Sequence, residues 1–437
     1  MTRVAALLAA ATLTPVQLVC APTARAVAPP PVDQSFLPVP GPAAPPFPTE
    51  RSKECAVAVD SATRRVPDRP DLQAAWAVTR GAGQTVAIID TGVARHRLLP
   101  RLVPGGDFVA SGDGTEDCDG HGTIVAGIVG AALDEKSGFS GIAPDATILG
   151  IRQSSSRFRD VEGGDGVGDV DTLAAAVRLA ADRGATVINV SSVACVAADD
   201  VLDDRALGAA LAYAVDVKNA VVVAAAGNVG GHGSCPKQNV TSGSQPDWEH
   251  VDVVASPCWY DDYVLTVGSA RADGTASEFS LGGPWVDVAA PAEGVVSLSP
   301  AGEGVVDQAP DSAEPQSISG TSYAAPMVAG VVALLRSAMP YLTARQVMKR
   351  IEDTALTPGA GWNPVLGRGI VDVVGALDNV GLTAARHSAP ARALTGERSP
   401  VGSTRPALVA SALGIALAVV LISVPRLRRR RDSVSLD

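Results

Sequence analysis

Short apolar runs rich in valine, isoleucine and alanine alternate along the chain with longer segments whose apolar residues recur at helical spacing. The short runs predict buried strands, at residues 85–90, 147–152, 186–191, 221–225, 264–267 and 286–289. The longer patterns predict helices, at residues 72–83, 170–183, 206–218, 323–339 and 343–354, with one more built of small residues after residue 121. Strands that alternate with helices in this way form a parallel sheet covered on both faces. We therefore predict an α/β fold with a mainly parallel central sheet.

The hydrophobic pattern changes at both ends of the chain. Residues 1–26 combine an early arginine, a short apolar stretch and an Ala-Arg-Ala end, which is the arrangement of a secretory signal peptide. Cys20 raises the alternative of a lipoprotein, but the bulky Val19 before it disfavours that interpretation. A retained anchor is disfavoured as well, because the apolar stretch is short and contains Pro15.

A second apolar segment, residues 407–424, contains no charged side chain. As a helix it would span about 27 Å, close to the hydrocarbon thickness of a bilayer. A basic tail follows at residues 425–437, and positive residues stay on the cytoplasmic side of a membrane. We therefore predict a single-pass protein of the cell membrane, with its main domain extracytoplasmic and its tail cytoplasmic.

Between these ends the chain divides into three parts. Residues 27–71 form a proline-rich extension, residues 72–380 the main domain, and residues 381–406 a linker rich in Ala, Arg, Ser and Pro. The prolines exclude helix and central strand, so the extension is expected to be extended. It either wraps the domain as an ordered coat or remains a disordered leader.

Charge narrows the range of partners. The formal net charge is -11, and the main basic cluster is the C-terminal tail. Without a broad basic surface to neutralise phosphates, the chain is not expected to bind nucleic acid. No loop shows clear ligand spacing for a cation, so we predict neither a metal nor another cofactor. The acidic stretch at residues 113–119 is expected to surround a histidine loop instead.

Three short motifs carry candidate chemistry. Ser322 lies in SGTSYAAP just before a helical pattern, His121 lies in DGHGT, and Asp90 ends the first predicted strand. Alone, Asp90 is ordinary turn chemistry and Ser322 an ordinary helix N-cap. A serine nucleophile, however, needs a base and a group that orients the base, and these three residues supply both in the chain order Asp, His, Ser.

That order and those motifs resemble the subtilisin-like serine proteases, over roughly residues 72 to 377. The resemblance implies a three-layer fold in which Ser322 attacks the scissile carbonyl, His121 shuttles the proton and Asp90 holds the imidazole. It also implies that Asn228, at the end of VVVAAAGN, donates its amide to the oxyanion. Pro326 would lie in the first turn of the helix after Ser322, where its missing N–H is tolerated.

The segment after the strand VINV departs from the family. Where subtilisins usually carry Ser-Leu-Gly-Gly along the substrate backbone, this chain reads Ser191, Ser192, Val193, Ala194. Ser191 and Ser192, with Gly227, are the expected substrate-binding residues. Bulk at the next two positions predicts a narrowed primary pocket and narrow specificity. The glycine-rich loop 154–170 is either a flexible cover over the cleft or a tolerated surface insertion.

The cysteines suit an oxidising compartment. Beyond Cys20, the preferred disulfides join Cys55 to Cys118 and Cys195 to Cys235, leaving Cys258 free. The first would pin the extension near the His121 loop, and the second would brace loops beside Asn228. Other pairings of the five cysteines remain open.

The combination of signal peptide, tied extension, triad, membrane helix and arginine-rich tail resembles the mycosins, which are membrane-anchored proteases of actinobacterial type VII (ESX) secretion systems. The motif IRQSS at residues 151–155 agrees. This resemblance implies limited proteolysis of secreted protein substrates and a scaffolding role among the components of the secretion membrane complex. A mainly structural component with dispensable catalysis and a general surface protease remain the alternatives.

Overall fold

The computed structural model describes residues 26–57, 66, 69–230, 235–310, 316–357 and 361–378. The predicted signal segment up to residue 25, the linker, the membrane helix at 407–424 and the basic tail lie outside the described residues. Within the described ranges, the helices are all too short or too polar to cross a bilayer.

The core of the domain is a seven-stranded sheet in the order β11-β10-β8-β6-β2-β4-β3, and every neighbouring pair is parallel. Its strands are β2 (Thr85–Asp90), β3 (Leu102–Asp107), β4 (Thr147–Arg152), β6 (Val187–Val190), β8 (Val221–Ala225), β10 (Val264–Ala270) and β11 (Val288–Pro291). The central strands are buried along almost their whole length, as strands covered on both faces must be. The predicted parallel α/β sheet is thus confirmed.

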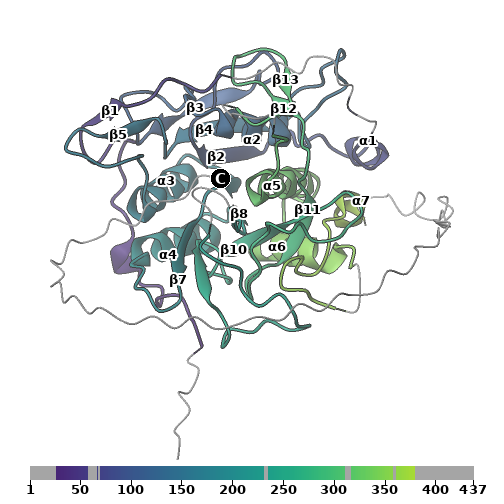
Figure 1. Ribbon diagram of the computed structural model, residues 1–437. Coiled ribbons are helices and arrows are strands. Elements are labelled where there is room, and N and C mark those ends of the chain that lie inside the picture. Colours follow the sequence, from purple (N-terminus) through teal and green to yellow (C-terminus); the bar gives the residue numbers. More distant parts are fainter. Residues whose placement is uncertain are drawn as a thin grey trace, which may run out of the picture.

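Helices cover both faces of the sheet (Figure 1). On one face lie α3 (Val170–Asp182) and α4 (Arg205–Ala212), and on the other lie α2 (His121–Gly130) and α5 (Thr321–Ala338). The helix α5 packs across several of the strands and is buried through most of its turns. The remaining helices are α1 (Pro70–Trp76), α6 (Ala344–Thr354) and α7 (Val373–Leu377).

Two helix predictions were too long. Helix α1 ends at Trp76 rather than at residue 83, because the chain turns through Gly81 and Gly83, both at positive φ, before it enters β2. The segment predicted as one helix at residues 206–218 is α4 followed by a π-helical turn, η2 (Tyr213–Val217).

The proline-rich extension lies against the domain over residues 26–57. It contains a short 3₁₀ turn, η1 (Gln34–Phe36), and one strand, β1 (Thr49–Arg51). The Val27 N–H donates to the Trp248 carbonyl (2.8 Å), and the Arg178 guanidinium donates to the Pro38 carbonyl (3.2 Å). Residues 26–57 therefore form an ordered coat on the domain, which is one of the two alternatives considered for the extension.

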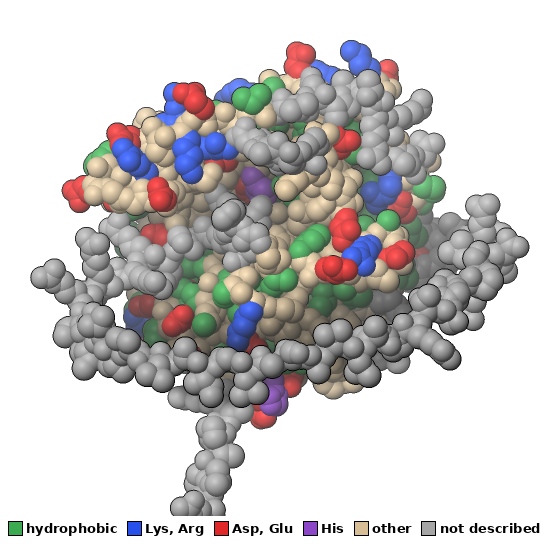
Figure 2. All heavy atoms as spheres, in the orientation of Figure 1, with side chains coloured by type: hydrophobic (Ala, Val, Ile, Leu, Met, Phe, Trp, Pro, Cys, Tyr) green, Lys and Arg blue, Asp and Glu red, His purple; other side chains and the backbone are tan. Residues whose placement is uncertain are grey.

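The extension also adds a strand to the loop at residues 154–170. Strand β1 pairs antiparallel with β5 (Phe158–Asp160), and Glu50 and Arg159 form an ion pair of 2.6 Å across the two strands. Figure 2 shows acidic and basic side chains gathered over this two-stranded sheet. The glycine-rich loop is therefore built into a sheet with the extension.

Two further small sheets lie near the ends of the main strands. Strand β7 (Ala194–Ala197) pairs antiparallel with β9 (Val253–Ser256), and β12 (Ser297–Leu298) pairs antiparallel with β13 (Val305–Val306). The pairing of β7 with β9 fixes the backbone that follows the expected substrate-binding residues Ser191 and Ser192.

Candidate active site

The candidate residues converge at the carboxyl edge of the sheet, where open parallel sheets bind their ligands. Asp90 is the last residue of β2, and Asn228 follows the end of β8. His121 is the first residue of α2, and Ser322 is the second residue of α5. Four elements that are distant in sequence therefore deliver one side chain each to the same edge.

Asp90 and His121 are in direct contact. The imidazole Nδ1 lies 2.7 Å from Asp90 Oδ1, and the aspartate side chain is fully buried while the histidine side chain is 12% exposed. The absence of a side chain at Gly122 permits this approach, since a Cβ there would lie 2.0 Å from the Gly92 carbonyl oxygen and 3.0 Å from Asp90 Cβ. The buried carboxylate thus fixes both the tautomer and the orientation of the ring.

Asp117 holds the segment that presents His121. Its Oδ1 accepts from Thr91 Oγ1 (2.8 Å) and the Gly120 N–H (2.7 Å), and its Oδ2 accepts from the Thr123 N–H (2.8 Å) and Thr123 Oγ1 (2.6 Å). One carboxylate therefore joins the residue after Asp90 to the first turn of α2. Burial raises the pKa of Asp117 to about 6, although these hydrogen bonds from Thr123, Thr91 and Gly120 act to lower it.

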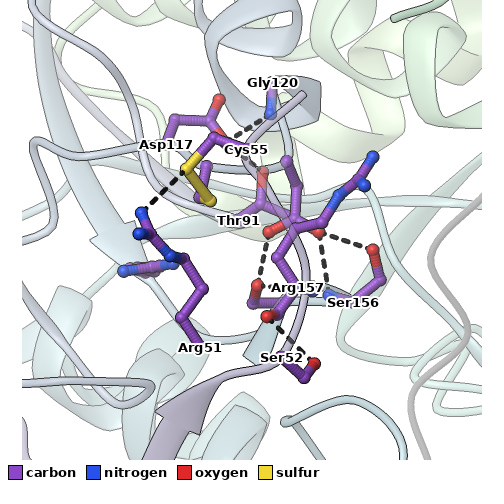
Figure 3. The surroundings of a disulfide bond; sticks show 12 residues. Arg51, Ser52, Cys55, Thr91, Asp117, Gly120, Ser156 and Arg157 are labelled. Atoms are coloured by element: carbon purple, nitrogen blue, oxygen red, sulfur yellow. Dashed lines mark hydrogen bonds between the residues drawn. A yellow bond between two sulfur atoms is a disulfide. The ribbon is translucent and has the colours of Figure 1, made fainter. Parts of the chain in front are cut away.

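The first disulfide closes on the same segment. Cys55 of the extension is bonded to Cys118, which lies between Asp117 and Asp119 (Figure 3). Asp119 accepts from Ser155 Oγ (2.5 Å) and from the N–H and Oγ of Ser156 (2.8 and 2.7 Å). Since these serines lead into β5, and β5 pairs with β1, the extension is attached to the histidine loop at two places.

Ser322 and Asn228 border one common space. Asn228 Oδ1 accepts from the N–H and the Oγ1 of Thr321, both at 3.0 Å, which turns the amide nitrogen of Asn228 away from Thr321. A Cβ placed on Gly320 would lie 3.2 Å from Ser322 Oγ and 3.5 Å from Asn228 Nδ2. The hydroxyl and the amide therefore face the same point, as an attacking group and an oxyanion donor must.

The expected position of Pro326 was wrong. Helix α5 begins at Thr321, so Pro326 is its sixth residue and lies inside the helix. Pro326 has no N–H to donate to the carbonyl of Ser322, four residues earlier. Ser191 Oγ donates to that carbonyl instead (2.9 Å), and Ser191 Oγ in turn accepts from Asn189 Nδ2 (2.8 Å). Ser191, which follows β6, thus supplies the hydrogen bond that the Ser322 carbonyl does not receive from within the helix.

The two halves of the site meet through aromatic contact. The ring centroids of His121 and Tyr323, the neighbour of Ser322, lie 5.3 Å apart. The start of α2 and the start of α5 therefore face each other.

The expected substrate-binding residues lie beside Ser322. Ser191 and Ser192 are 3% and 1% exposed, and the Gly227 N–H donates to Thr321 Oγ1 (3.1 Å). The second disulfide joins Cys195 to Cys235 close by. Cys258 is free and buried, and burial raises the pKa of its thiol to about 12, which makes it a poor nucleophile.

Sequence reasoning missed three supporting residues: Thr91, Asp117 and Thr321. Each lies within four residues of Asp90, His121 or Ser322 along the chain. The available signals were a threonine inside the Asp90 and Ser322 motifs and an aspartate in the acidic stretch just before the His121 motif. In the part of the chain that the structure describes, no group of three or more His, Cys, Asp or Glu side chains is arranged to hold a metal ion.

Comparison with known proteins identifies the family. A model described as the Subtilase family matches residues 81–381. Mycosin-4 of Mycobacterium tuberculosis (strain ATCC 25618 / H37Rv) is 52% identical over 440 residues, which cover 95% of each chain.

Solved structures agree with this assignment. The MycP3 protease from the type VII (ESX-3) secretion system is 42% identical with a TM-score of 0.74, covering 80% of this chain and 99% of that one. A chain in the periplasmic assembly from the ESX-5 inner membrane complex is 37% identical with a TM-score of 0.75, covering 87% and 100%. With its parallel sheet and the Asp, His, Ser order at the sheet's carboxyl edge, the chain belongs to the mycosins, serine proteases of the subtilase family.

Proposed function

We propose that Asp90, His121 and Ser322 form the catalytic triad of this protease and that Asn228 donates to the oxyanion. The observation that carries the proposal is the buried Asp90–His121 contact of 2.7 Å, facing the helix start that holds Ser322. This mechanism requires no metal ion or other cofactor.

The chemical steps follow from these positions. Ser322 Oγ forms a bond to the scissile carbonyl carbon while its proton passes to His121 Nε2, and Asp90 stabilises the resulting imidazolium. The carbonyl oxygen becomes an oxyanion beside Asn228 Nδ2, and the positive end of α5 lowers the energy of that charge further. The C–N bond then breaks as His121 protonates the leaving amine. Water, deprotonated by His121, hydrolyses the acyl-enzyme.

The substrate backbone is proposed to lie along residues 191–192 and 227. These residues flank Ser322 through the Ser191–Ser322 and Gly227–Thr321 hydrogen bonds. An endopeptidase needs such an extended edge, because peptides bind to proteases of this type as an added strand.

The setting is proposed to be the outer face of the cell membrane. Residues 407–424 would anchor the chain as a single helix, with the catalytic domain extracytoplasmic and residues 425–437 in the cytoplasm. The two disulfides suit an oxidising compartment, which supports this location. Peptide mapping after protease treatment of intact cells tests the orientation: the domain should be digested from outside and the tail protected.

Within that setting, we propose limited proteolysis of secreted substrates and membership of a type VII secretion membrane complex. The support is the likeness to MycP3 of the ESX-3 system and to a chain of the ESX-5 inner membrane complex. The same likeness favours a second candidate function, a structural component whose catalysis is dispensable.

One experiment separates the two functions. Cells lacking the protein are complemented with the wild type or with Ser322→Ala, and secretion and processing of the system's substrates are measured. Secretion that survives Ser322→Ala but fails without the protein favours the structural function. Loss of processing in Ser322→Ala supports the protease. The wild-type and Ser322→Ala proteins are also purified from the membrane. If neither co-purifies with membrane ATPase components, the result favours a general surface protease.

A further inference from the structure

We propose that the space receiving the substrate residue on the acyl side of the scissile bond is closed by Val193 and the Cys195–Cys235 disulfide, so that the enzyme cleaves after alanine or glycine. This inference rests on the proposed function, since it takes Ser322 as the nucleophile. It names the class of substrate that the site accepts.

The position of that substrate residue follows from the reacting atoms. Its carbonyl carbon must touch Ser322 Oγ, and its carbonyl oxygen must point to Asn228 Nδ2. Two backbone segments adjoin that point, because Ser191 Oγ bonds to the Ser322 carbonyl (2.9 Å) and the Gly227 N–H bonds to Thr321 Oγ1 (3.1 Å). The substrate side chain must therefore enter between residues 191–193 and residues 227–228.

That space is filled by the protein itself. A Cβ placed on Gly227 would lie 2.9 Å from Cys235 Sγ, 3.3 Å from Val193 Cγ2 and 3.5 Å from Leu281 Cδ2. Val193 and Cys235 are each 2% exposed, and Leu281 is fully buried. Three buried side chains thus pack against the glycine beside the oxyanion donor, where a long substrate side chain would meet them.

The filling side chains are held in place from several directions. Cys235 is bonded to Cys195 of β7, and its N–H donates to the Asn228 carbonyl (2.7 Å). Val193 immediately precedes β7, whose first residue Ala194 pairs with Ser256 of β9. A β-branched valine has few χ1 rotamers with which to move aside.

A larger substrate side chain would have to displace these packed atoms. Overpacking a filled site is unfavourable, and pockets discriminate by roughly tenfold or more per misfitting group in kcat/KM. We therefore expect matched peptides that differ only in this residue to be cleaved at least about tenfold faster, by kcat/KM, with alanine than with phenylalanine.

The first experiment measures that ratio for the full chain and for Val193→Gly. Removal of the valine side chain should raise the phenylalanine-to-alanine ratio by about tenfold. The matched control is Val201→Gly, the same change at a residue that is 89% exposed, and it should leave the ratio unchanged. Val193→Ala provides a second, milder enlargement should the glycine variant fold poorly, and it should shift the ratio in the same direction.

The second experiment compares the rates at which reagents of different size label Ser322, without turnover of a peptide. The full chain is treated with peptidyl diphenyl phosphonates bearing an alanine or a phenylalanine side chain, and separately with a small fluorophosphonate that carries neither. Labelling of Ser322 by the alanine reagent at least about tenfold faster than by the phenylalanine reagent supports the inference. Equal rates, with Ser322 still labelled by the fluorophosphonate, overturn the inference alone. No labelling of Ser322 by any reagent overturns the proposed function and the inference with it.

Discussion

The two halves of the candidate site are held by different means. On one side, a carboxylate, Asp117, joins Thr91, the neighbour of Asp90, to Gly120, the neighbour of His121, and the loop carrying that carboxylate is bonded through Cys118 to the proline-rich extension. On the other side, Ser322 and Asn228 are held by short hydroxyl side chains, Ser191 and Thr321, that belong to the buried core.

The difference follows from where each half begins. Ser322 lies on α5, a helix that is already held by its burial against several strands. Its backbone needs only one added hydrogen bond, at the carbonyl that Pro326 leaves without a helical donor. His121 starts a helix that follows a long loop, and its orientation depends on fixing that loop. The histidine half should therefore be more sensitive to changes outside the reacting groups than the serine half.

Among residues outside the triad, the largest expected effect is that of Asp117→Ala. Without the carboxylate, Thr91 and the first turn of α2 lose their common acceptor, and a displacement of His121 by about 1 Å lowers kcat by roughly a hundredfold. Peptide hydrolysis with active-site titration measures the loss, which should fall on kcat more than on KM.

The matched control is Asp113→Ala in the same acidic stretch. Asp113 accepts from the N–H and Oγ1 of Thr115 and pairs with Arg95 at 3.6 Å. Its replacement should leave kcat close to the wild-type value. Equal losses in the two variants would mean that the acidic stretch acts only through general stability.

Opening the first disulfide should weaken the fold more than the chemistry. Cys55→Ser is expected to lower the free energy of unfolding by about 3 kcal/mol, because the disulfide closes a long chain segment. At temperatures below unfolding, kcat should fall only several-fold, since the four hydrogen bonds to Asp117 remain. Denaturant unfolding and peptide hydrolysis give the two values. A collapse of kcat in a folded Cys55→Ser protein would show that the extension, rather than Asp117, orients His121.

The serine half should respond more mildly. Ser191→Ala removes the donor to the Ser322 carbonyl, and one neutral hydrogen bond corresponds to roughly a three- to tenfold loss in kcat/KM. In that background Pro326→Ala restores a helical N–H facing the same carbonyl and should recover part of the loss. If Pro326→Ala gives no recovery, the Ser191–Ser322 bond is not what supports the nucleophile.

The smallest effect concerns pH. Because burial raises the pKa of Asp117 from 3.8 to about 6, the folded state binds this proton more tightly than the unfolded state does. Between about pH 4 and 6 the folded state therefore carries more protons, and the free energy of unfolding falls by about 1 kcal/mol per pH unit as pH rises. Asp117→Asn should remove this contribution in denaturant titrations. A wild-type slope retained in the variant would contradict it.

The sequence predicted the parts of the fold that repeat a strong local pattern. The β-branched runs at residues 85–90, 147–152 and 221–225 coincide with β2, β4 and β8. Strand β3 was missed because it lies at the sheet edge and contains Pro104 and Gly105, which carry no strand signal.

The candidate site, too, was predicted only in part from the sequence. The motif order identified Asp90, His121 and Ser322, the family resemblance added Asn228, and both expected cysteine pairs are present in the structure. The role of Asp117 and the position of Pro326 depend on where α2 and α5 begin relative to their neighbours. Those contacts form across the fold, so a one-dimensional pattern does not contain them.

The most direct test of the account is the reaction of the full chain with a fluorophosphonate, with the labelled residue identified by mass spectrometry. We predict that Ser322 is labelled, that Ser322→Ala abolishes labelling, and that Asp90→Asn slows it by roughly a thousandfold or more because His121 loses its correct tautomer. Labelling at another residue, or an unchanged rate in Asp90→Asn, would contradict the triad.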